Sequence, residues 1–334
     1  MWKDMDGFLE SYQLIKNWHD VNVLTHQIST EQLHLSHEFV LKTVFEITLK
    51  EMAKDYGPPP CDFSWFVMGS AGRCEQAVIS DQDHGILYEE ASESAASYFS
   101  VFGKMLVSAL DYIGYPQCEG NVMSSNPLWC QSKRNWEIQI KKWIHDNTWE
   151  SLRYLLIFCD ARVVVGDEKK VLSLKNIIHQ TIEKQPTVLM RLFENTKHTV
   201  KGIGLFNQFL TVSSGPYTGH MDLKTTAIFP YVNAVRLLSI IEKIETTSTL
   251  SRIEALCMRD KYTKIIDTHH SNFKKLMHYR LLYGDTTNYE GGHYLNIKML
   301  ERAEKLEMKQ ILRDVEKLQR VTEVMVQGVI KNER

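Results

Sequence analysis

Two carboxylates separated by a single residue are the feature of this sequence with the clearest chemical potential. They are Asp81 and Asp83, in the segment SDQDHG at residues 80–85. Because side chains alternate between the two faces of an extended strand, both carboxylates point to one side and His84 to the other. Mg²⁺ in proteins typically takes one or two carboxylates, with water and substrate phosphates completing its coordination. The pattern therefore predicts a Mg²⁺ or Mn²⁺ site at Asp81 and Asp83.

A second segment, MGSAGR at residues 68–73, has the composition of a phosphate-binding turn. Gly69 lets the backbone approach a ligand closely, and the free N–H groups of a helix that starts near Ser70 suit phosphate oxygens. Arg73 could add a bidentate contact to those oxygens. Either segment alone is common in proteins, but the two together, each at the end of an expected strand, predict a site for phosphoryl-type transfer.

A small sheet has to position these two segments. The apolar run before Gly69 indicates a buried strand, and the alternation of strands with helices after it is typical of a small domain that combines both. The expected elements are a strand at 63–68, a turn and short helix at 69–80, a strand at 81–88, a helix at 95–113 and a strand at 114–123.

Helices are expected on both sides of this sheet. Residues 1–56 have helical periodicity, with a capping box at Ser29 and Gln32 and a stop at Gly57, which three prolines follow. From about Asn135 onward the chain is almost entirely helical, including a buried helix at 152–165 and a last helix at about 295–330. The apolar stripe of that last helix indicates either packing within the chain or a homodimer seam.

The expected fold is α+β, a small mixed sheet with helices before it and a helical bundle after it. The corresponding domain bounds are 1–56, 57–145 and 146–334. The formal net charge is −2, which argues against a broad nucleic-acid-binding surface. Neither a signal peptide nor an apolar run long enough for a membrane span is present, so the sequence predicts a cytoplasmic protein without a membrane partner. The six cysteines form no CxxC pair and are expected to be reduced thiols.

The segment GSAGRCEQ…SDQDHGILY resembles the GS-x-GR-x-EQ…TDQD signature of a bacterial nucleotidyltransferase family. That family is related to the PII-protein uridylyltransferases and belongs to the DNA polymerase β-like nucleotidyltransferase superfamily. The resemblance continues through CEGNVMSSNPLW at 118–129 and FCDAR at 158–162, and through parts of residues 222–256. It covers roughly residues 35–280, and it implies a nucleotidyltransferase domain followed by a helical domain.

The resemblance also implies roles for individual residues. Gly69 and Ser70 would hold the nucleotide triphosphate, Asp81 and Asp83 would bind the metals, and Lys224 would contribute to nucleotide binding. Arg73 would act with Glu75, either as a phosphate contact that supports the site or as a structural ion pair.

A third acid completes the catalytic set in this superfamily by acting on the incoming nucleophile. Two residues are candidates for that role. Glu119 falls on the strand expected at 114–123, whereas Asp160 lies in a segment with helical character. If neither serves, the catalytic set is incomplete.

The implied reaction moves a nucleoside monophosphate from an NTP to an acceptor hydroxyl with Mg²⁺ or Mn²⁺ and releases pyrophosphate. The acceptor implied by the resemblance is a side chain of a small regulatory protein, which would place the reaction in signal transduction. Two alternatives stay open. One is a non-catalytic nucleotide-sensing or protein-binding module that keeps the fold, and the other is a transferase that modifies an antibiotic.

Overall fold

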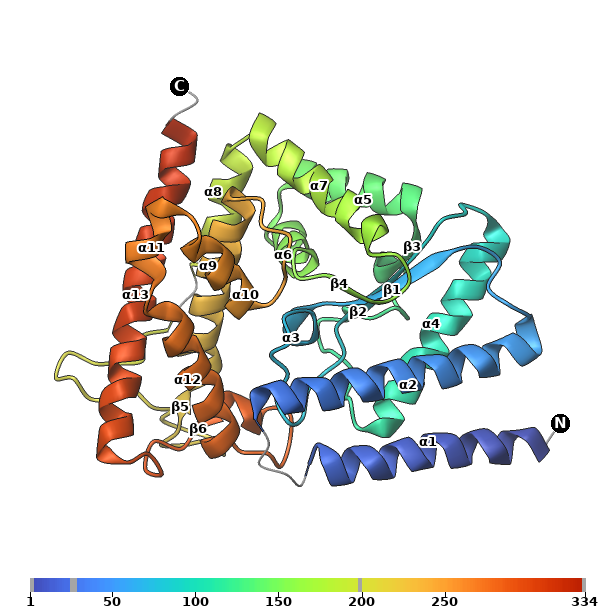
Figure 1. Ribbon diagram of the computed structural model, residues 1–334, viewed down its shortest axis with the longest axis horizontal. Coiled ribbons are helices and arrows are strands. Elements are labelled where there is room, and N and C mark those ends of the chain that lie inside the picture. The colour runs from blue at the N-terminus through green and yellow to red at the C-terminus, as the bar shows by residue number, and fades with distance from the viewer. Residues whose placement is uncertain (1–2, 25–28, 198–199, 332–334) are drawn as a thin grey trace. The chain divides into compact units, whose positions relative to one another are not determined.

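The computed structural model describes residues 3–24, 29–197 and 200–331. Its helices and strands, shown in Figure 1, group into two compact units. Unit 1 takes in Met1–Lys142 and Asp160–Ile177, whereas unit 2 takes in Trp143–Cys159 and Ile178–Arg334. None of the described helices combines the length and the apolar character that crossing a bilayer requires.

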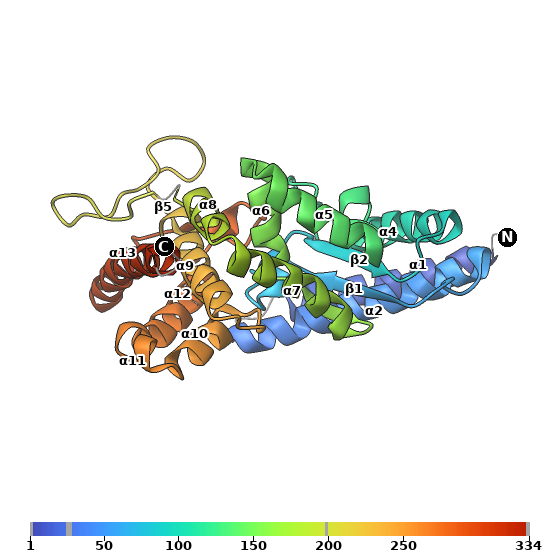
Figure 2. The same ribbon diagram turned by 90° about the horizontal axis from the view of Figure 1, so that it is seen from above.

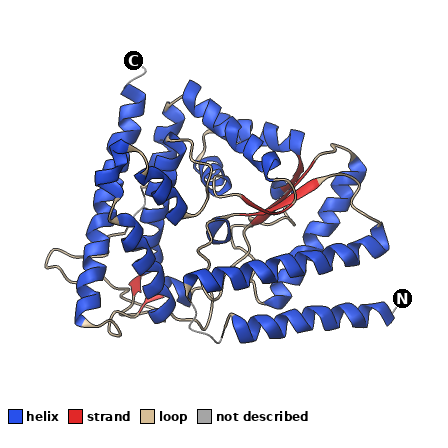
Figure 3. Ribbon diagram, in the orientation of Figure 1, coloured by secondary structure: helices blue, strands red, loops and turns tan. Residues whose placement is uncertain are grey.

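Unit 1 is organised around a mixed four-stranded sheet in the order β3-β2-β1-β4. The strands are β1 (Phe63–Val67), β2 (His84–Tyr88), β3 (Cys130–Ser132) and β4 (Arg162–Val165). β1 pairs antiparallel with both β2 and β4, and β2 pairs parallel with β3. The four strands are the red arrows grouped together in Figure 3. The mixed sheet confirms the fold class expected from the sequence.

The two faces of this sheet are buried by different helices. Trp65, Val67 and Ile86 point into a core shared with α2 (Thr30–Tyr56) and α4 (Glu93–Ile113). Phe66 points the opposite way, where its ring lies 5.7 Å from that of Trp136 on α5 (Lys133–Asp146). Burial on both faces explains why β1 is mostly apolar rather than alternating between apolar and polar residues.

The N-terminal helices begin and end where their local signals predict. The predicted capping box of α2 is present, because the Ser29 side chain accepts from the Gln32 backbone and the Gln32 side chain accepts from the Ser29 N–H. The helix ends at Gly57, whose φ of +76° is a conformation that favours glycine. α1 (Lys3–Asn22) packs along α2 and α4 within the same unit.

Three predictions of secondary structure are wrong. The last helix, expected from about 295, begins at Arg302, and Leu295 belongs instead to the short strand β6 (Tyr294–Leu295). Residues 114–123 form no strand. Their only described ladder contact is a single bridge between Gln117 and Gln82, and a turn follows it. The helix expected at 152–165 ends early, since α6 (Trp149–Phe158) gives way to a turn and then to β4. The β-branched run Val163-Val164-Val165 favours a strand beside β1 over continued helix, because tertiary pairing outweighs apolar content.

Unit 2 is mainly helical and includes one short two-stranded ribbon. Its ribbon pairs β5 (Met221–Asp222) with β6 (Tyr294–Leu295) in antiparallel fashion. The elements that lie wholly within unit 2 are α6, α8 (Thr187–Asn195), the π-helical turn η2 (Lys224–Ile228), α9 (Phe229–Ile241), α10 (Thr249–Cys257), α11 (Asp260–Ile266), α12 (His269–Tyr283), the turn η3 (Gly291–His293) and α13 (Arg302–Lys331). Helices α5 and α7 (Glu168–Lys184) have residues in both units. Residues 200–220, which precede β5, extend as open loops in Figure 2.

The core of unit 2 lies between α9 and α13. Tyr231 and Val235 of α9 are fully buried there with Ile311, Val315 and Leu318 of α13. These three residues belong to the apolar stripe predicted for the last helix. Their burial inside the chain favours packing within the protein over a homodimer seam for this part of the helix.

Candidate active site

The carboxylates of Asp81 and Asp83 converge at the entrance to β2. One oxygen of each, together with Sγ of Cys118, forms a group whose ligand atoms all lie within 4.8 Å of one another. The intervening Gln82 and the following His84 are buried, with exposed fractions of 3% and 2%, whereas the two acids are half-buried. The side chains therefore alternate as the sequence predicts, and two negative charges lie close enough to share one cation.

Gly69 lies directly against one of these carboxylates. A Cβ atom built on Gly69 would overlap Oδ2 of Asp83 and lie 3.0 Å from its Cγ. The residue also has φ +53°, a conformation that side chains disfavour. Both constraints require glycine at this position. The turn α3 (Gly69–Gly72) starts here, and the first N–H groups of a helical turn have no acceptor within it.

Backbone hydrogen bonds fix the extended segment on both sides. The Met68 N–H donates to the carbonyl of Asp83 at 2.7 Å, which joins the end of β1 to the acidic pair. On the opposite side, the N–H groups of Gln82 and His84 donate to the carbonyls of Pro116 and Val122. The segment 116–122 therefore lines the site without forming a regular strand.

A chain of buried side-chain hydrogen bonds supports the residue between the two acids. The indole of Trp65 donates to Nδ1 of His84 at 3.2 Å, so Nε2 of His84 carries the proton and donates to Gln82. The Gln82 amide in turn donates to the carbonyls of Val107 and Tyr115. Burial lowers the pKa of His84 to about 3, which keeps the ring neutral. His84 thus orients the acidic segment from the core side.

Cys118 is the member of the cluster that sequence reasoning did not select. Burial, followed by the charges of Asp83 and Asp81, raises the pKa of the Cys118 thiol well above its usual range. The thiol is therefore neutral and adds no negative charge to the two carboxylates. The sequence predicts its neighbour Glu119 as a candidate third acid, because a strand is expected at 114–123. The signal that was available is the position of Cys118 directly before the candidate acid.

Arg73 belongs to a buried ion triad. Its Nε lies 2.8 Å from Glu75, and its Nη1 lies 2.7 Å from Asp160. The exposed fractions of the three side chains are 7%, 6% and 0%. Gly72 allows the close approach, since a Cβ there would overlap the carbonyl oxygen of Asp160. Of the two roles predicted for Arg73, this geometry favours the structural ion pair.

The two candidates for a third acid lie in different surroundings. Glu119 is exposed and sits in a turn rather than on the strand expected there. Asp160 is fully buried in a turn after α6 and is engaged with Arg73. Neither belongs to the described group of Asp81, Asp83 and Cys118.

Ser70 and Lys224 complete the set of residues predicted to bind nucleotide. The Ser70 hydroxyl lies in the turn after Gly69, 3.2 Å from the hydroxyl of Ser80. Lys224 belongs to unit 2, where its ammonium lies 2.9 Å from Nε2 of His293. It also lies over the ring faces of Phe229 and Tyr289, with distances to the ring centroids of 5.3 and 5.4 Å.

Two family models match the chain, one on either side of residues 151–185. Residues 12–150 match the model described as "Putative nucleotidyltransferase DUF294". Residues 186–324 match the model described as "Putative nucleotidyltransferase substrate binding domain". The chain belongs to this nucleotidyltransferase family. None of the curated proteins matches it. The acidic pair lies inside the first matched segment and Lys224 inside the second, whereas Asp160 lies outside both.

The donor set at the acidic pair fits a divalent cation with oxygen ligands. Asp81 and Asp83 supply two carboxylates, the number that Mg²⁺ commonly takes from protein. The neutral thiol of Cys118 is a weak ligand for such a hard ion. A bound cation would also relieve the repulsion between the two carboxylates, which a triphosphate would otherwise increase.

Proposed function

We propose that this protein transfers a nucleoside monophosphate from an NTP to an acceptor hydroxyl. In the proposed step the acceptor oxygen forms a bond to the α-phosphorus, and the bond from the α-phosphorus to the bridging oxygen breaks. Pyrophosphate leaves, and the hydroxyl proton passes to a base or to solvent. The acceptor class that the family resemblance favours is a side chain of a small regulatory protein, as in PII uridylylation.

One observation carries this proposal. The carboxylates of Asp81 and Asp83 converge on one point, and the Gly69 backbone lies against the second of them without a side chain between. Such an arrangement would let phosphate oxygens approach the Gly69 backbone beside a cation. A Mg²⁺ or Mn²⁺ ion bound there would neutralise phosphate charge and polarise the reacting phosphoryl group.

The residues of the chain have separate roles in the proposal. Asp81 and Asp83 hold the cation, while Gly69 and Ser70 present backbone and hydroxyl groups to the triphosphate. Lys224 contributes a positive charge to nucleotide binding. Glu119 is the remaining candidate for the acid that orients or deprotonates the acceptor, because its carboxylate is exposed and not committed to an ion pair that the structure describes.

One observation favours the second candidate function, a nucleotide-sensing module without catalysis. The third ligand atom beside the acidic pair belongs to a neutral thiol, Cys118, and Asp160 is neutralised by Arg73. A protein with this set could bind a metal–nucleotide complex and lack the base for the transfer step.

The decisive experiment uses NTPs that carry a label on the α-phosphate. The chain is incubated with Mg²⁺, each NTP in turn and a cell lysate, and the D81N/D83N variant serves as the control. We expect a labelled macromolecular product and an equal amount of pyrophosphate from the unaltered chain alone. If Mg–NTP binds but no NTP gives pyrophosphate or labelled product, the sensing module replaces the transferase.

A further inference from the structure

Lys224 is a half-buried cation with no carboxylate partner among the residues that the structure describes. Its described contacts are the imidazole of His293 and the ring faces of Phe229 and Tyr289. The nearest acid in the sequence, Asp222, accepts from the backbone N–H of Thr225 at 3.0 Å. Aromatic faces stabilise an ammonium group only partly, and burial of a charge without a counter-ion is costly. The surroundings of Lys224 therefore favour an anion that the described residues do not supply.

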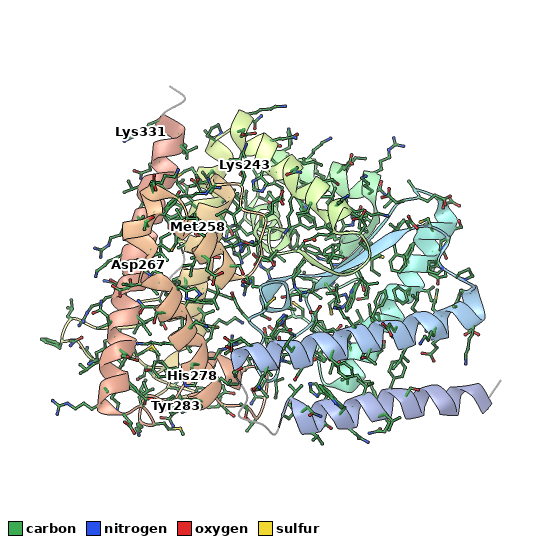
Figure 4. The ribbon with its side chains drawn as sticks, in the orientation of Figure 1. Lys243, Met258, Asp267, His278, Tyr283 and Lys331 are labelled. Atoms are coloured by element: carbon green, nitrogen blue, oxygen red, sulfur yellow. The ribbon has the colours of Figure 1, made fainter. Side chains whose placement is uncertain are left out.

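The ribbon of β5 and β6 brings further groups with the same preference to Lys224. Asp222 pairs with Tyr294, which places His293 beside the start of η2. Leu295 also forms a bridge with Gly284, one turn after Arg280 on α12. Tyr283, labelled in Figure 4, is the last residue of that helix and leads into this junction. The segment at Asp222 and Lys224 thus meets two later segments, the end of α12 and residues 293–295, at one place.

Two cations act on the imidazole of His293 at this junction, while the carboxylates of Asp222 and Glu290 act on the neighbouring Tyr294. Burial, then the charges of Lys224 and Arg280, lower the pKa of His293 to about 3. His293 is therefore neutral and accepts one N–H of the Lys224 ammonium, which leaves that group two further donors. Because Nε2 accepts from Lys224, the neutral ring carries its proton on Nδ1, which is a further donor.

Two buried polar atoms on the same ribbon also have no hydrogen-bond partner among the described residues. They are the hydroxyl of Thr225, directly after Lys224, and Nδ1 of His220, directly before β5. Buried polar groups are nearly always paired, so each such atom indicates a ligand or solvent group that completes the site. Tyr217, which stacks on Tyr294 with ring centroids 4.2 Å apart, closes this region on one side.

We propose that Lys224, His293 and Arg280 form a binding site for a phosphate-type anion within unit 2. This inference rests on the proposed function and deepens it, because it assigns an oxyanion site to the segment matched by the substrate-binding family model. The anion is a phosphate group either of the nucleotide or of the acceptor. Oxygen atoms of that group would take the two remaining Lys224 donors and pair with the Arg280 guanidinium.

The test measures binding of inorganic phosphate and pyrophosphate to the full chain by calorimetry in EDTA. Without a divalent cation, the carboxylates of Asp81 and Asp83 repel these anions, so the transfer site contributes little. We expect Lys224→Met and His293→Gln to weaken binding about tenfold or more, the loss typical of one charged hydrogen bond. Thermal melts of both variants establish that they are folded.

Lys309→Met is the matched control. Lys309 is also a lysine of unit 2 that lies over an aromatic ring, at 5.1 Å from the centroid of Phe209, and it takes no part in the junction. Its substitution should leave the affinity for pyrophosphate unchanged. The D81N/D83N variant should bind pyrophosphate at least as tightly as the unaltered chain does, because it removes two charges that repel the anion.

The outcomes separate this inference from the proposed function. It is overturned if the unaltered chain binds neither anion, if both Lys224→Met and His293→Gln bind them undiminished, or if D81N/D83N loses binding equally. Metal-free binding that depends on Lys224 upholds it, even if no NTP is ever turned over. Competition by ATP would assign the site to the nucleotide, and binding without such competition would assign it to the acceptor.

Discussion

The backbone of Gly69 packs directly against the carboxylate of Asp83, since a Cβ on Gly69 would overlap Oδ2 of Asp83. We expect Gly69→Ala to displace that carboxylate and to strain a backbone with φ +53°. Metal-dependent NTP binding should fall at least tenfold, and stability should fall by about 1–2 kcal/mol. Calorimetry with Mg–NTP and urea unfolding measure the two effects.

Gly328→Ala is the control for that substitution. Gly328 lies on α13 with open space around its Cα, and its φ is in the ordinary range. Alanine there should raise stability by about 0.5–1 kcal/mol, because helical glycine is unfavourable. Undiminished Mg–NTP affinity in Gly69→Ala would contradict the proposed triphosphate position.

The acidic pair should be required for metal-dependent nucleotide binding. Asp81→Asn with Asp83→Asn removes both charges while it keeps the size of the side chains, so the fold should be retained. We expect Mg–NTP binding to be lost in calorimetry, because the amides hold a cation poorly. Asp111→Asn, at an exposed aspartate of the same unit, should change nothing. If the double variant binds Mg–NTP as before, the nucleotide is held elsewhere.

The Arg73 triad should act on stability rather than on nucleotide contact. Arg73→Gln removes the buried cation that lies between Glu75 and Asp160, and such losses typically cost about 3–5 kcal/mol. Asp160→Asn should destabilise for the same reason. Urea unfolding of each variant measures the free energy of unfolding. A stable Arg73→Gln protein with weakened NTP binding would instead support the phosphate contact predicted as the alternative.

Glu119 provides the test of catalysis. If its carboxylate orients or deprotonates the acceptor hydroxyl, Glu119→Gln should lower turnover about a hundredfold or more while NTP affinity stays nearly constant. Glu90→Gln, at an exposed glutamate of the same unit, is the matched control. Steady-state turnover and Mg–NTP calorimetry are compared for both variants. Full turnover in Glu119→Gln would remove it from the mechanism.

Acid stability should depend on the pair of Glu38 and Arg162, whose closest atoms lie 2.7 Å apart. Burial raises the pKa of Glu38, but hydrogen bonds and charge from Arg162 and Lys42 outweigh it and hold that pKa below 4.5. The unfolded state therefore takes up the proton first as the pH falls. The stabilisation is complete above about pH 4.5 and is lost as the pH falls through the lower, folded-state pKa.

Urea unfolding from pH 7 to pH 3.5 measures this effect. Glu38→Gln should be less stable than the unaltered chain at pH 7, and the difference should shrink below about pH 4.5. Glu46→Gln, on the exposed face of the same helix, controls for the loss of one negative charge. A Glu38→Gln difference that does not change with pH would contradict the assignment.

The local sequence determined the elements whose signals lie within a few residues. The capping box at Ser29 and the stop at Gly57 set the limits of α2, because both act through hydrogen bonds and dihedral angles of neighbouring residues. The period of two at Asp81 and Asp83 predicted that their carboxylates share a side, which depends only on extended backbone. The family and its nucleotidyltransferase class also followed from short segments around these residues.

Tertiary structure decided the features that depend on distant partners. Residues 162–165 form a strand because their backbone pairs with β1, and no neighbouring residue in the sequence indicates that partner. Arg73 is a second example. The sequence allows its guanidinium to contact phosphate, but in the fold it pairs with Asp160, 87 residues away. Cys118 joins the acidic pair, and His293 reaches Lys224, only when the fold brings those segments together. The sequence determines the chemistry of each side chain. Which distant residue that side chain contacts depends on how the whole chain packs.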